Sequence, residues 1–434
     1  MATTLTSVAE TTHAAKDAAR LLARTGTAVK DAALEAIAAS LLERAPEILT
    51  ANARDLELAR EAGLSAALLD RLSLDERRIA GIVRAVRQIV ELADPVGEVI
   101  DGHRLASGLD VRKVRVPLGV VAVVYEARPN VTIDAAALCL KSGNAIVLRG
   151  SSSATHSNAA LAQIAAEAAV EAGLPAGCVS LIAGGGREEL AELATQRDSV
   201  DLIIPRGGES LKEALQAVAT VPVMYAASGN CHVYVDASAD LESAEAIVLN
   251  AKTQRPGVCN AAETLLVHEQ IAPAFLARML PSLERAGVLV RGDERTCAIA
   301  DGLSAPGGDG SEELPLAIEP AEQEDWDREY LALTLAVGVV DSTEAAIEHI
   351  ARHGSGHSEA IVTANTTSAR AFQVGVDAAC VYVNASTRFT DGGEFGMGAE
   401  IGNSTQKLHA RGPIGLRELC TFKYLIEGDG HVRA

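Results

Sequence analysis

The chain has 434 residues, a formal net charge of −20 at pH 7 and a hydrophobic fraction of 48%. This length suffices for about two to four domains and excludes a small disulfide-stapled scaffold. The excess of acidic residues supplies no positive field for a phosphodiester backbone, so nucleic acid is not expected as the main partner.

The seven cysteines are widely scattered and contain no C-x-x-C pair, so neither a disulfide framework nor a metal site is expected. The first residues lack the apolar core of a secretory signal, and Glu10 and Asp17 argue against a transit peptide. No uncharged run approaches the roughly 18 residues that a membrane helix needs. A cytoplasmic location is the resulting expectation.

The N-terminal segment is predicted to be helical. Apolar residues recur at helical spacing in two series, one from Leu34 to Ile48 and one from Ile79 to Val90. Short β-prone segments between Pro95 and Pro117, in a charged setting, then predict an exposed hairpin.

Short apolar runs separated by helix-length segments fill most of the remaining chain. Such runs are typical of buried parallel strands, because helices cover both faces of the sheet. A first series predicts a doubly wound α/β domain, with runs at Val120 to Tyr125, Ala145 to Leu148, Val179 to Ile182, Leu202 to Ile204 and Val221 to Met224. A second series predicts another α/β domain beginning near Asp236, with runs at Val233 to Val235, Thr264 to Val267, Leu335 to Val340, Ala360 to Val362 and Val381 to Val383. We expect a surface loop at Gly302 to Pro320 and a β-prone C-terminal piece at Thr421 to Ile426.

The common phosphate-binding motifs are not where a nucleotide domain would usually carry them. The motif G-x-x-x-x-G-K-[ST] is absent, and no G-x-G-x-x-G follows the first predicted parallel strand. Gly184, Gly185 and Gly186 follow the strand that ends at Ile182 and precede a helix, where free N–H groups could bind a phosphate. A plain strand-to-helix turn explains these glycines equally well.

Cys259 is the candidate nucleophile. It lies in the run KTQRPGVCN, in which Pro256 and Gly257 end the preceding helix. A turn position with Lys252 and Arg255 nearby favours the thiolate. The alternative is an inert core cysteine, since most free cysteines are of that kind.

Two polar segments follow predicted strands, where ligands meet parallel sheets. Asn130 could donate its side-chain amide to a developing oxyanion, or could cap a helix that begins at Val131. The segment Ser386 to Thr390 supplies hydroxyls and a guanidinium suited to an anion, although a polar loop would look the same. Cys231 and His232 are expected to point to opposite faces of a strand and to be structural.

Five long motifs carry a resemblance to a known family. They are VPLGVVAVVYEARPNVT from Val116, DLIIPRGG from Asp201, GNCHVYVD from Gly229, KTQRPGVCNAAETLLVH from Lys252 and VNASTRFTDGGEFGMGAEIGNSTQKLHARGPIGL from Val383. Together they resemble the gamma-glutamyl phosphate reductase family, a reductive branch of the aldehyde dehydrogenase superfamily. The resemblance covers most of the chain. It implies an NADPH-dependent reduction of L-glutamyl 5-phosphate to L-glutamate 5-semialdehyde and phosphate, in proline synthesis from glutamate.

The resemblance also implies roles for two residues. Cys259 matches the family's nucleophile, whose thiolate attacks the acyl phosphate to give a thioester, and NADPH supplies the hydride that reduces it. Asn130 matches the oxyanion-hole asparagine, which would act with the backbone N–H of Cys259. Hydrolytic relatives carry a glutamate in the segment that corresponds to Ala226 to Gly229, and the lack of a carboxylate there fits a reductase.

The expected cofactor contacts are Arg149, Ser151 and Ser152, in the segment to which the resemblance points, together with Gly184 and Gly185 of the glycine turn described above. Similar enzymes bind the adenosine ribose with a basic residue and, when NAD is preferred, an acid three positions later. Here Arg149 is followed by Ser152 at that position, so NADP(H) is favoured over NAD(H).

Glu329 resembles the glutamate that holds the nicotinamide ribose, and the alternative is an ordinary exposed acid. The expected anion contacts for substrate and phosphate are Arg128, Arg255 and Arg388.

The expected fold is aldehyde dehydrogenase-like, with two doubly wound α/β domains and an oligomerisation unit. The NADP(H)-binding domain is expected at residues 1–96 and 118–235, the catalytic domain at 236–390, and the oligomerisation unit at 97–117 and 391–434. A homodimer or homotetramer is expected because an exposed hairpin and a β-prone tail need partners for their edges. A glutamate kinase is a candidate partner for transfer of the labile acyl phosphate.

Two alternative functions stay open at this point. One is a related dehydrogenase that acylates coenzyme A or uses another acyl phosphate. The other is a non-catalytic scaffold or binding subunit of a kinase complex, for which loss of the Cys259 thiol would have no effect.

Overall fold

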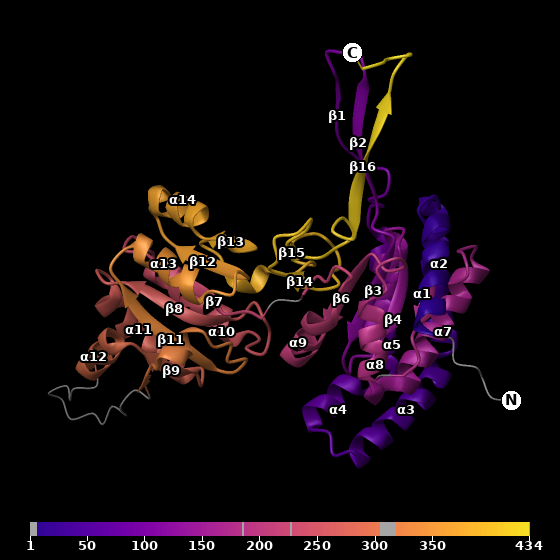
Figure 1. Ribbon diagram of the computed structural model, residues 1–434. Helices are drawn as coiled ribbons and strands as arrows, with labels where there is room; N and C mark the ends of the chain where they lie inside the picture. Colours follow the sequence, from indigo (N-terminus) through magenta and orange to yellow (C-terminus); the bar gives the residue numbers. More distant parts are fainter. Residues whose placement is uncertain (1–6, 185, 226–227, 304–317, 434) are drawn as a thin grey trace. The chain divides into compact units, whose positions relative to one another are not determined.

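The computed structural model describes residues 7–184, 186–225, 228–303 and 318–433. The chain folds into two compact units (Figure 1). The first comprises Met1–Ala226, Gly396–Gly402 and Leu408–Ala434, and the second comprises Ala227–Phe395 and Asn403–Lys407. Each unit has a hydrophobic core of its own.

The first unit begins with helices and continues with strands that alternate with helices. Its elements are α1 (Val8–Leu22), α2 (Thr27–Glu43), α3 (Ala45–Glu61), α4 (Ala66–Leu72), α5 (Glu76–Glu91), β1 (Val99–Arg104), β2 (Asp110–Pro117), β3 (Val120–Tyr125), α6 (Asn130–Lys141), β4 (Ala145–Arg149), η1 (Ser152–Ala154), α7 (Thr155–Glu171), β5 (Val179–Leu181), α8 (Arg187–Ala194), β6 (Leu202–Arg206), α9 (Glu209–Val218), β15 (Gly412–Pro413) and β16 (Cys420–Glu427).

The predicted helix through Leu34 and Ile48 is in fact two helices, α2 and α3. Pro46 lies in the first turn of α3. Its ring clashes with the carbonyl four residues earlier, and it has no N–H to bond to that carbonyl, so one helix cannot continue through this position. The apolar spacing did not predict α1 and α4, which are capped by the side chains of Ser7 and Ser65.

A four-stranded parallel sheet with the order β5-β4-β3-β6 forms the centre of the first unit. Every residue of β3 and β4 is buried, which explains why these strands read as continuous apolar runs. The expected fifth strand, Val221 to Met224, forms only an isolated bridge between Val223 and Ile203. The sheet brings the start of α6 and the residues after Arg149 to one edge, because the carboxyl ends of parallel strands lie together.

Strands β1, β2 and β16 form a second, antiparallel sheet, which we call the arm. The predicted hairpin is present as β1 and β2. The C-terminal strand β16 pairs with β2 over its whole length, from Cys420 opposite Pro117 to Glu427 opposite Asp110. Figure 1 shows these three strands extending away from the rest of the first unit. Among the described strands, the arm therefore has β2 in the middle and β1 and β16 at its two edges.

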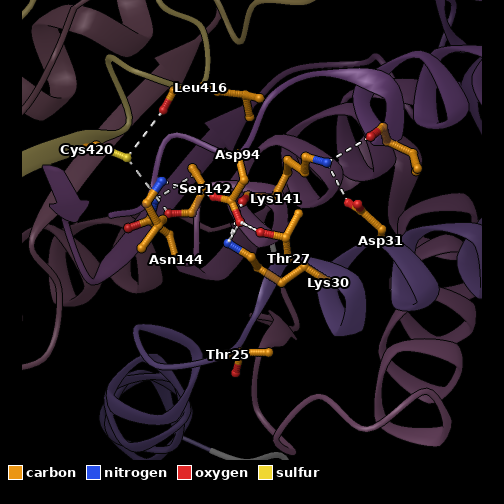
Figure 2. Close-up of polar contacts among 12 residues, drawn as sticks. Thr25, Thr27, Lys30, Asp31, Asp94, Lys141, Ser142, Asn144, Leu416 and Cys420 are labelled. Atoms are coloured by element: carbon orange, nitrogen blue, oxygen red, sulfur yellow. Dashed lines mark hydrogen bonds and ion pairs between the residues drawn. The ribbon is translucent and has the colours of Figure 1, made fainter. Parts of the chain in front are cut away.

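A buried polar network holds the base of the arm (Figure 2). The ammonium group of Lys30 in α2 lies 2.6 Å from the carboxylate of Asp94, on the segment that leads into β1. It also donates to the main-chain carbonyl of Lys141 at the end of α6, at 3.0 Å. The side-chain amide of Asn144 donates to the carbonyl of Leu419, next to the start of β16, at 2.8 Å. These contacts attach the segments that lead into β1 and β16 to α2 and to the end of α6.

The second unit contains a seven-stranded parallel sheet with the order β10-β9-β11-β8-β7-β12-β13. Its elements are β7 (Cys231–Val235), α10 (Leu241–Thr253), β8 (Ala262–His268), α11 (Ala272–Arg285), β9 (Leu289–Gly292), α12 (Glu294–Leu303), β10 (Ile318–Pro320), η2 (Gln323–Trp326), β11 (Thr334–Val340), α13 (Thr343–His353), β12 (Ser358–Val362), α14 (Thr366–Gly375), β13 (Cys380–Val383), η3 (Thr387–Phe389) and β14 (Asn403–Ser404).

The boundary between the two units lies earlier than residue 235, where we expected it. β7 pairs with β8 and β12 inside the second sheet, so the segment that carries it belongs to the second unit. Strands β9 and β10, of four and three residues, were not predicted. β10 lies within the expected loop of residues 302–320, of which residues 304–317 are outside the described part of the chain.

Among the described residues, no helix is both long enough and apolar enough to cross a membrane.

Candidate active site

The loop that carries Cys259 connects α10 to β8. α10 ends at Thr253, and the loop passes through Pro256 and Gly257 before β8 begins at Ala262. The Cys259 side chain is partly exposed, unlike most of the other cysteines. The predicted turn position is thus present, and the partial exposure of Cys259 suits a nucleophile.

The backbone of Cys259 is packed against Gly229. A Cβ atom placed on Gly229 would lie 1.5 Å from the carbonyl oxygen of Cys259, so only glycine fits at this position. The thiol of Cys231 donates to the same carbonyl oxygen at 3.1 Å. The Cys231 side chain is therefore structural, as the sequence predicted.

Lys252 does not act on the thiol in the way that its position in the sequence suggested. Its ammonium group is fully buried and lies 2.5 Å from the carboxylate of Glu263, which is also fully buried. Burial lowers the pKa of Lys252, and Glu263 opposes this effect. Burial also raises the pKa of Glu263, to about 7.

Arg388 is the cation that the structure places beside Cys259. Its guanidinium donates to the side-chain oxygens of Asn260 and, at 2.9 Å, of Gln254. Burial lowers the pKa of Arg388, the charge of Arg255 lowers it further, and the Cys259 thiolate raises it. Arg255 and Cys259 therefore both interact electrostatically with Arg388.

Further hydrogen bonds join the loop of Arg388 to Asn260. The Asn260 side chain donates to the carbonyl of Thr390 at 2.9 Å, and the hydroxyl of Thr387 donates to the Asn260 carbonyl at 2.7 Å. The segment from Ser386 to Thr390 is thus a fixed part of the nucleophile's surroundings and not a plain polar loop.

Glu329 lies next to the nucleophile loop in the same unit. Its carboxylate accepts a hydrogen bond from the N–H of Gly229 at 2.7 Å. The side chain is partly buried, so the alternative of an ordinary exposed acid does not hold. Of the segment Ala226 to Gly229, the residues Ala226 and Ala227 lie outside the described part of the chain.

In the first unit, Asn130 is the first residue of α6. Pro129 occupies the N-cap position, and the Asn130 amide donates to the carboxylate of Asp134 at 2.9 Å. The capping alternative for Asn130 is therefore wrong. Burial raises the pKa of Asp134 to about 6, while the hydrogen bond from Asn130 and the charge of Arg206 oppose that rise.

Arg128 is exposed on the turn before α6, and its carbonyl accepts from the N–H of Val131 at 3.0 Å. Arg128 and Asn130 therefore lie in the first unit, whereas the other two predicted anion contacts, Arg255 and Arg388, lie in the second.

Arg149 is at the carboxyl end of β4 and is only 7% exposed. Its guanidinium donates to the carbonyl of Gly186 at 2.7 Å. Burial lowers the pKa of Arg149, and the charge of Glu189 raises it. Among the expected neighbours, Ser152 is exposed and begins η1, and the hydroxyl of Ser151 lies 2.6 Å from that of Ser153.

The glycine turn after β5 is occupied by a side chain of its own helix. A Cβ atom on Gly184 would lie 2.8 Å from a carboxylate oxygen of Glu189, and Gly184 has a positive φ of 104°. Gly185 lies outside the described residues. A carboxylate at this turn disfavours a phosphate there, so a plain strand-to-helix turn describes Gly184 better than a phosphate cradle.

Comparison with known proteins places the chain among its relatives. The model of the aldehyde dehydrogenase family matches residues 1–297. The gamma-glutamyl phosphate reductases of Moorella thermoacetica and Thermobifida fusca are 55% and 54% identical over 96% of this chain and 97% of their own length. The crystal structure of gamma-glutamyl phosphate reductase from Thermotoga maritima is 46% identical, with a TM-score of 0.94 over 99% of this chain and 100% of that one. The chain belongs to the gamma-glutamyl phosphate reductase family.

The expected aldehyde dehydrogenase-like α/β fold is confirmed by these structures. An acetylating aldehyde dehydrogenase from Geobacillus thermoglucosidasius shares the fold with a TM-score of 0.66, but at 20% identity it shows the fold alone. Membership of the gamma-glutamyl phosphate reductase family therefore does not favour the coenzyme A alternative.

Several residues around the candidate site of this family member were not found from the sequence. Asn260 and Glu263 lie inside the motif that begins at Lys252, but nothing in the motif shows that they bind Arg388 and Lys252. Asp134 was missed as well, although it lies four residues after Asn130 and one helical turn brings such residues together. That spacing was a usable signal.

Proposed function

We propose that this chain reduces L-glutamyl 5-phosphate to L-glutamate 5-semialdehyde, with NADPH as reductant and release of phosphate. This is a step of proline synthesis from glutamate. The observation that carries the proposal is the 55% identity to a gamma-glutamyl phosphate reductase over 96% of the chain. The partial exposure of Cys259 and the electrostatic interaction between Cys259 and Arg388 support it.

In the proposed reaction the Cys259 thiolate attacks the acyl carbon of the substrate, the bond to the phosphate oxygen breaks, and a thioester forms. NADPH supplies the hydride that converts the thioester into the aldehyde and returns the thiolate. Arg255 and Arg388 favour the thiolate before the attack and offer positive charge to the leaving phosphate. Asn130 is proposed to donate its amide to the developing oxyanion.

Asp134 limits how Asn130 can act. It accepts one N–H of the Asn130 amide and so orients the group at the start of α6. Arg128, exposed on the preceding turn, is proposed as a contact for an anionic group of the substrate.

For the cofactor, we propose NADP(H) held by Arg149, Ser151 and Ser152. A guanidinium at the end of β4 and no carboxylate at Ser152 suit a 2′-phosphate. The charge of Glu189 near Arg149 weakens this preference, and because the Glu189 carboxylate also lies against Gly184, we do not propose Gly184 as a phosphate contact. Glu329, beside Gly229, is proposed to hold the nicotinamide ribose.

The deciding experiment is NADP⁺ reduction with glutamate 5-semialdehyde, with phosphate, with coenzyme A in its place, and with neither. Wild type and Cys259→Ala are compared. We expect turnover only with phosphate, and none in the variant. Turnover with coenzyme A alone would show that coenzyme A, and not phosphate, is the acyl acceptor. Turnover that survives Cys259→Ala would show that Cys259 is not the nucleophile or that the reaction is of another kind.

We further propose a homodimer or homotetramer that assembles through the arm, because β1 and β16 each present an unpaired edge with exposed apolar side chains such as Tyr424 and Ile426. A cytoplasmic location is proposed from the seven free cysteines, which suit a reducing compartment. A glutamate kinase is a candidate partner that would deliver the acyl phosphate.

A further inference from the structure

A buried ion pair joins the two ends of the nucleophile loop. Lys252 belongs to the last turn of α10, and Glu263 is the second residue of β8, so the pair spans the loop that holds Cys259. The two charged groups are 2.5 Å apart, and both side chains are fully buried. A buried pair is costly to desolvate and depends strongly on geometry, so it fixes how the helix end and the strand start lie against each other.

The same carboxylate reaches a second segment. The other oxygen of Glu263 accepts from the N–H of Leu331 at 3.3 Å. Leu331 has a φ of 53°, a left-handed conformation that a leucine adopts only when its surroundings hold it there. Leu331 lies two residues after Glu329, so Glu263 supports the corner from which Glu329 extends.

The contacts then return to the nucleophile. Glu329 accepts from the N–H of Gly229, and Gly229 packs against the carbonyl of Cys259. All of these residues lie in the second unit. The buried pair is thus connected both to the loop of Cys259 and to the carboxylate proposed to hold the nicotinamide ribose.

We propose that Lys252 and Glu263 are positioning residues, which hold the Cys259 loop and the Glu329 corner in the one arrangement that the reaction needs. The inference rests on the proposed function, because that function gives Cys259 and Glu329 their roles. Burial raises the pKa of Glu263 to about 7, and the charge of Glu329 contributes to this rise, so the two carboxylates act on each other.

The test removes both charges of the pair at once and leaves an acceptor for the Leu331 N–H. This variant is Lys252→Met with Glu263→Gln. The chain offers a matched control in the first unit, the buried pair of Lys30 and Asp94 (Figure 2). The control variant, Lys30→Met with Asp94→Asn, makes the same kind of change and likewise leaves an acceptor, here for the Val96 N–H.

Three quantities are measured on the full chain: the thermal midpoint, the steady-state kcat and KM, and the pH dependence of the rate at which iodoacetamide alkylates Cys259. For the Lys252 and Glu263 variant we expect a folded protein, a kcat lower by about 10- to 100-fold, and an altered alkylation profile. For the control variant we expect kcat and the alkylation profile of the wild type, whatever its thermal midpoint.

A folded Lys252 and Glu263 variant with the wild-type kcat and alkylation profile would overturn the proposal. An equal loss of kcat in the control variant would also overturn the proposal, because the effect would then come from general destabilisation. If the double variant does not fold, Glu263→Gln is compared with Asp94→Asn by the same measurements and with the same two outcomes. The alkylation rate needs no substrate, so it tests the positioning role even if the wild type shows no phosphate-dependent turnover and the proposed function fails.

Discussion

The backbone at Cys259 leaves no room for a side chain at position 229. Gly229 is buried against the Cys259 carbonyl, and its N–H binds Glu329. We expect Gly229→Ala to displace the nucleophile loop and to lower kcat by about 100-fold, since a shift of about 1 Å at a reacting atom has an effect of that size. Steady-state kinetics of the purified variant measure it.

Gly302→Ala is the matched control for that substitution. Gly302 lies in α12 of the same unit, and a Cβ atom there would meet no atom of the described residues within 4 Å. Alanine is the better helix former, so we expect unchanged kinetics and a slightly higher thermal midpoint. A Gly229→Ala enzyme as active as this control would show that the loop tolerates the displacement.

The stability of the second unit is expected to depend on pH through His357. This side chain is fully buried, and burial lowers its pKa to about 4. In the unfolded chain the pKa is about 6.5, so between these values only the unfolded state binds the proton and stability falls as pH falls. Between neutral pH and pH 4, this titration lowers the free energy of unfolding by about 3 kcal/mol.

His357→Gln removes that titration. Urea unfolding at neutral and at acidic pH should therefore show a smaller pH dependence of the free energy of unfolding in the variant than in the wild type. Equal slopes in the two proteins would mean that His357 does not carry the effect.

At the scale of the elements, the arm depends on the end of the chain. β16 covers one edge of β2 and is itself an edge of the arm. Deleting residues 422–434 keeps Leu419 and Cys420, which contact Asn144 and Ser142 at the base of the arm, but it leaves most of β2 without its partner. We expect the four-stranded parallel sheet to persist and the proposed homo-oligomer to be lost or replaced by aggregates.

Sedimentation velocity and circular dichroism of the truncated chain test this expectation. Unchanged assembly with β16 removed would exclude this strand from the proposed interface. Loss of helical signal in the truncated chain would instead mean that the C-terminal strand supports the whole first unit.

At the scale of the molecule, the two units have separate hydrophobic cores, so their unfolding need not be a single two-state transition. The one tryptophan of the sequence, Trp326, lies in the second unit. Tryptophan fluorescence therefore reports on the second unit, while circular dichroism reports on both. We expect the urea unfolding curves from fluorescence and from circular dichroism not to coincide. We expect NADPH to shift mainly the unfolding transition of the first unit, which circular dichroism follows and fluorescence does not.

Coincident curves, with and without NADPH, would show that the two units unfold as one. A shift of the fluorescence transition alone on addition of NADPH would place the strongest cofactor contacts in the second unit and would contradict the proposed role of Arg149.

The sequence by itself determined the elements whose patterns are local. The buried strands β3, β4 and β8 appear in the sequence as short apolar runs, because both faces of a parallel sheet are covered. The hairpin appears as a charged, β-prone segment. Pro256 and Gly257 likewise placed Cys259 on a turn. The division between α2 and α3 was also a local signal, at Pro46, but helical spacing alone did not reveal it.

Only the tertiary structure decided which distant residues meet. The sequence offered Lys252 and Arg255 as neighbours of the thiol, yet Lys252 pairs with Glu263 across the loop. The cation that binds the residue next to Cys259 is Arg388. Likewise, the C-terminal strand β16 pairs with β2, about 300 positions earlier in the sequence. The physical reason is that hydrogen-bond partners of strands and of buried charges are chosen by the packing of whole elements, which no local spacing records.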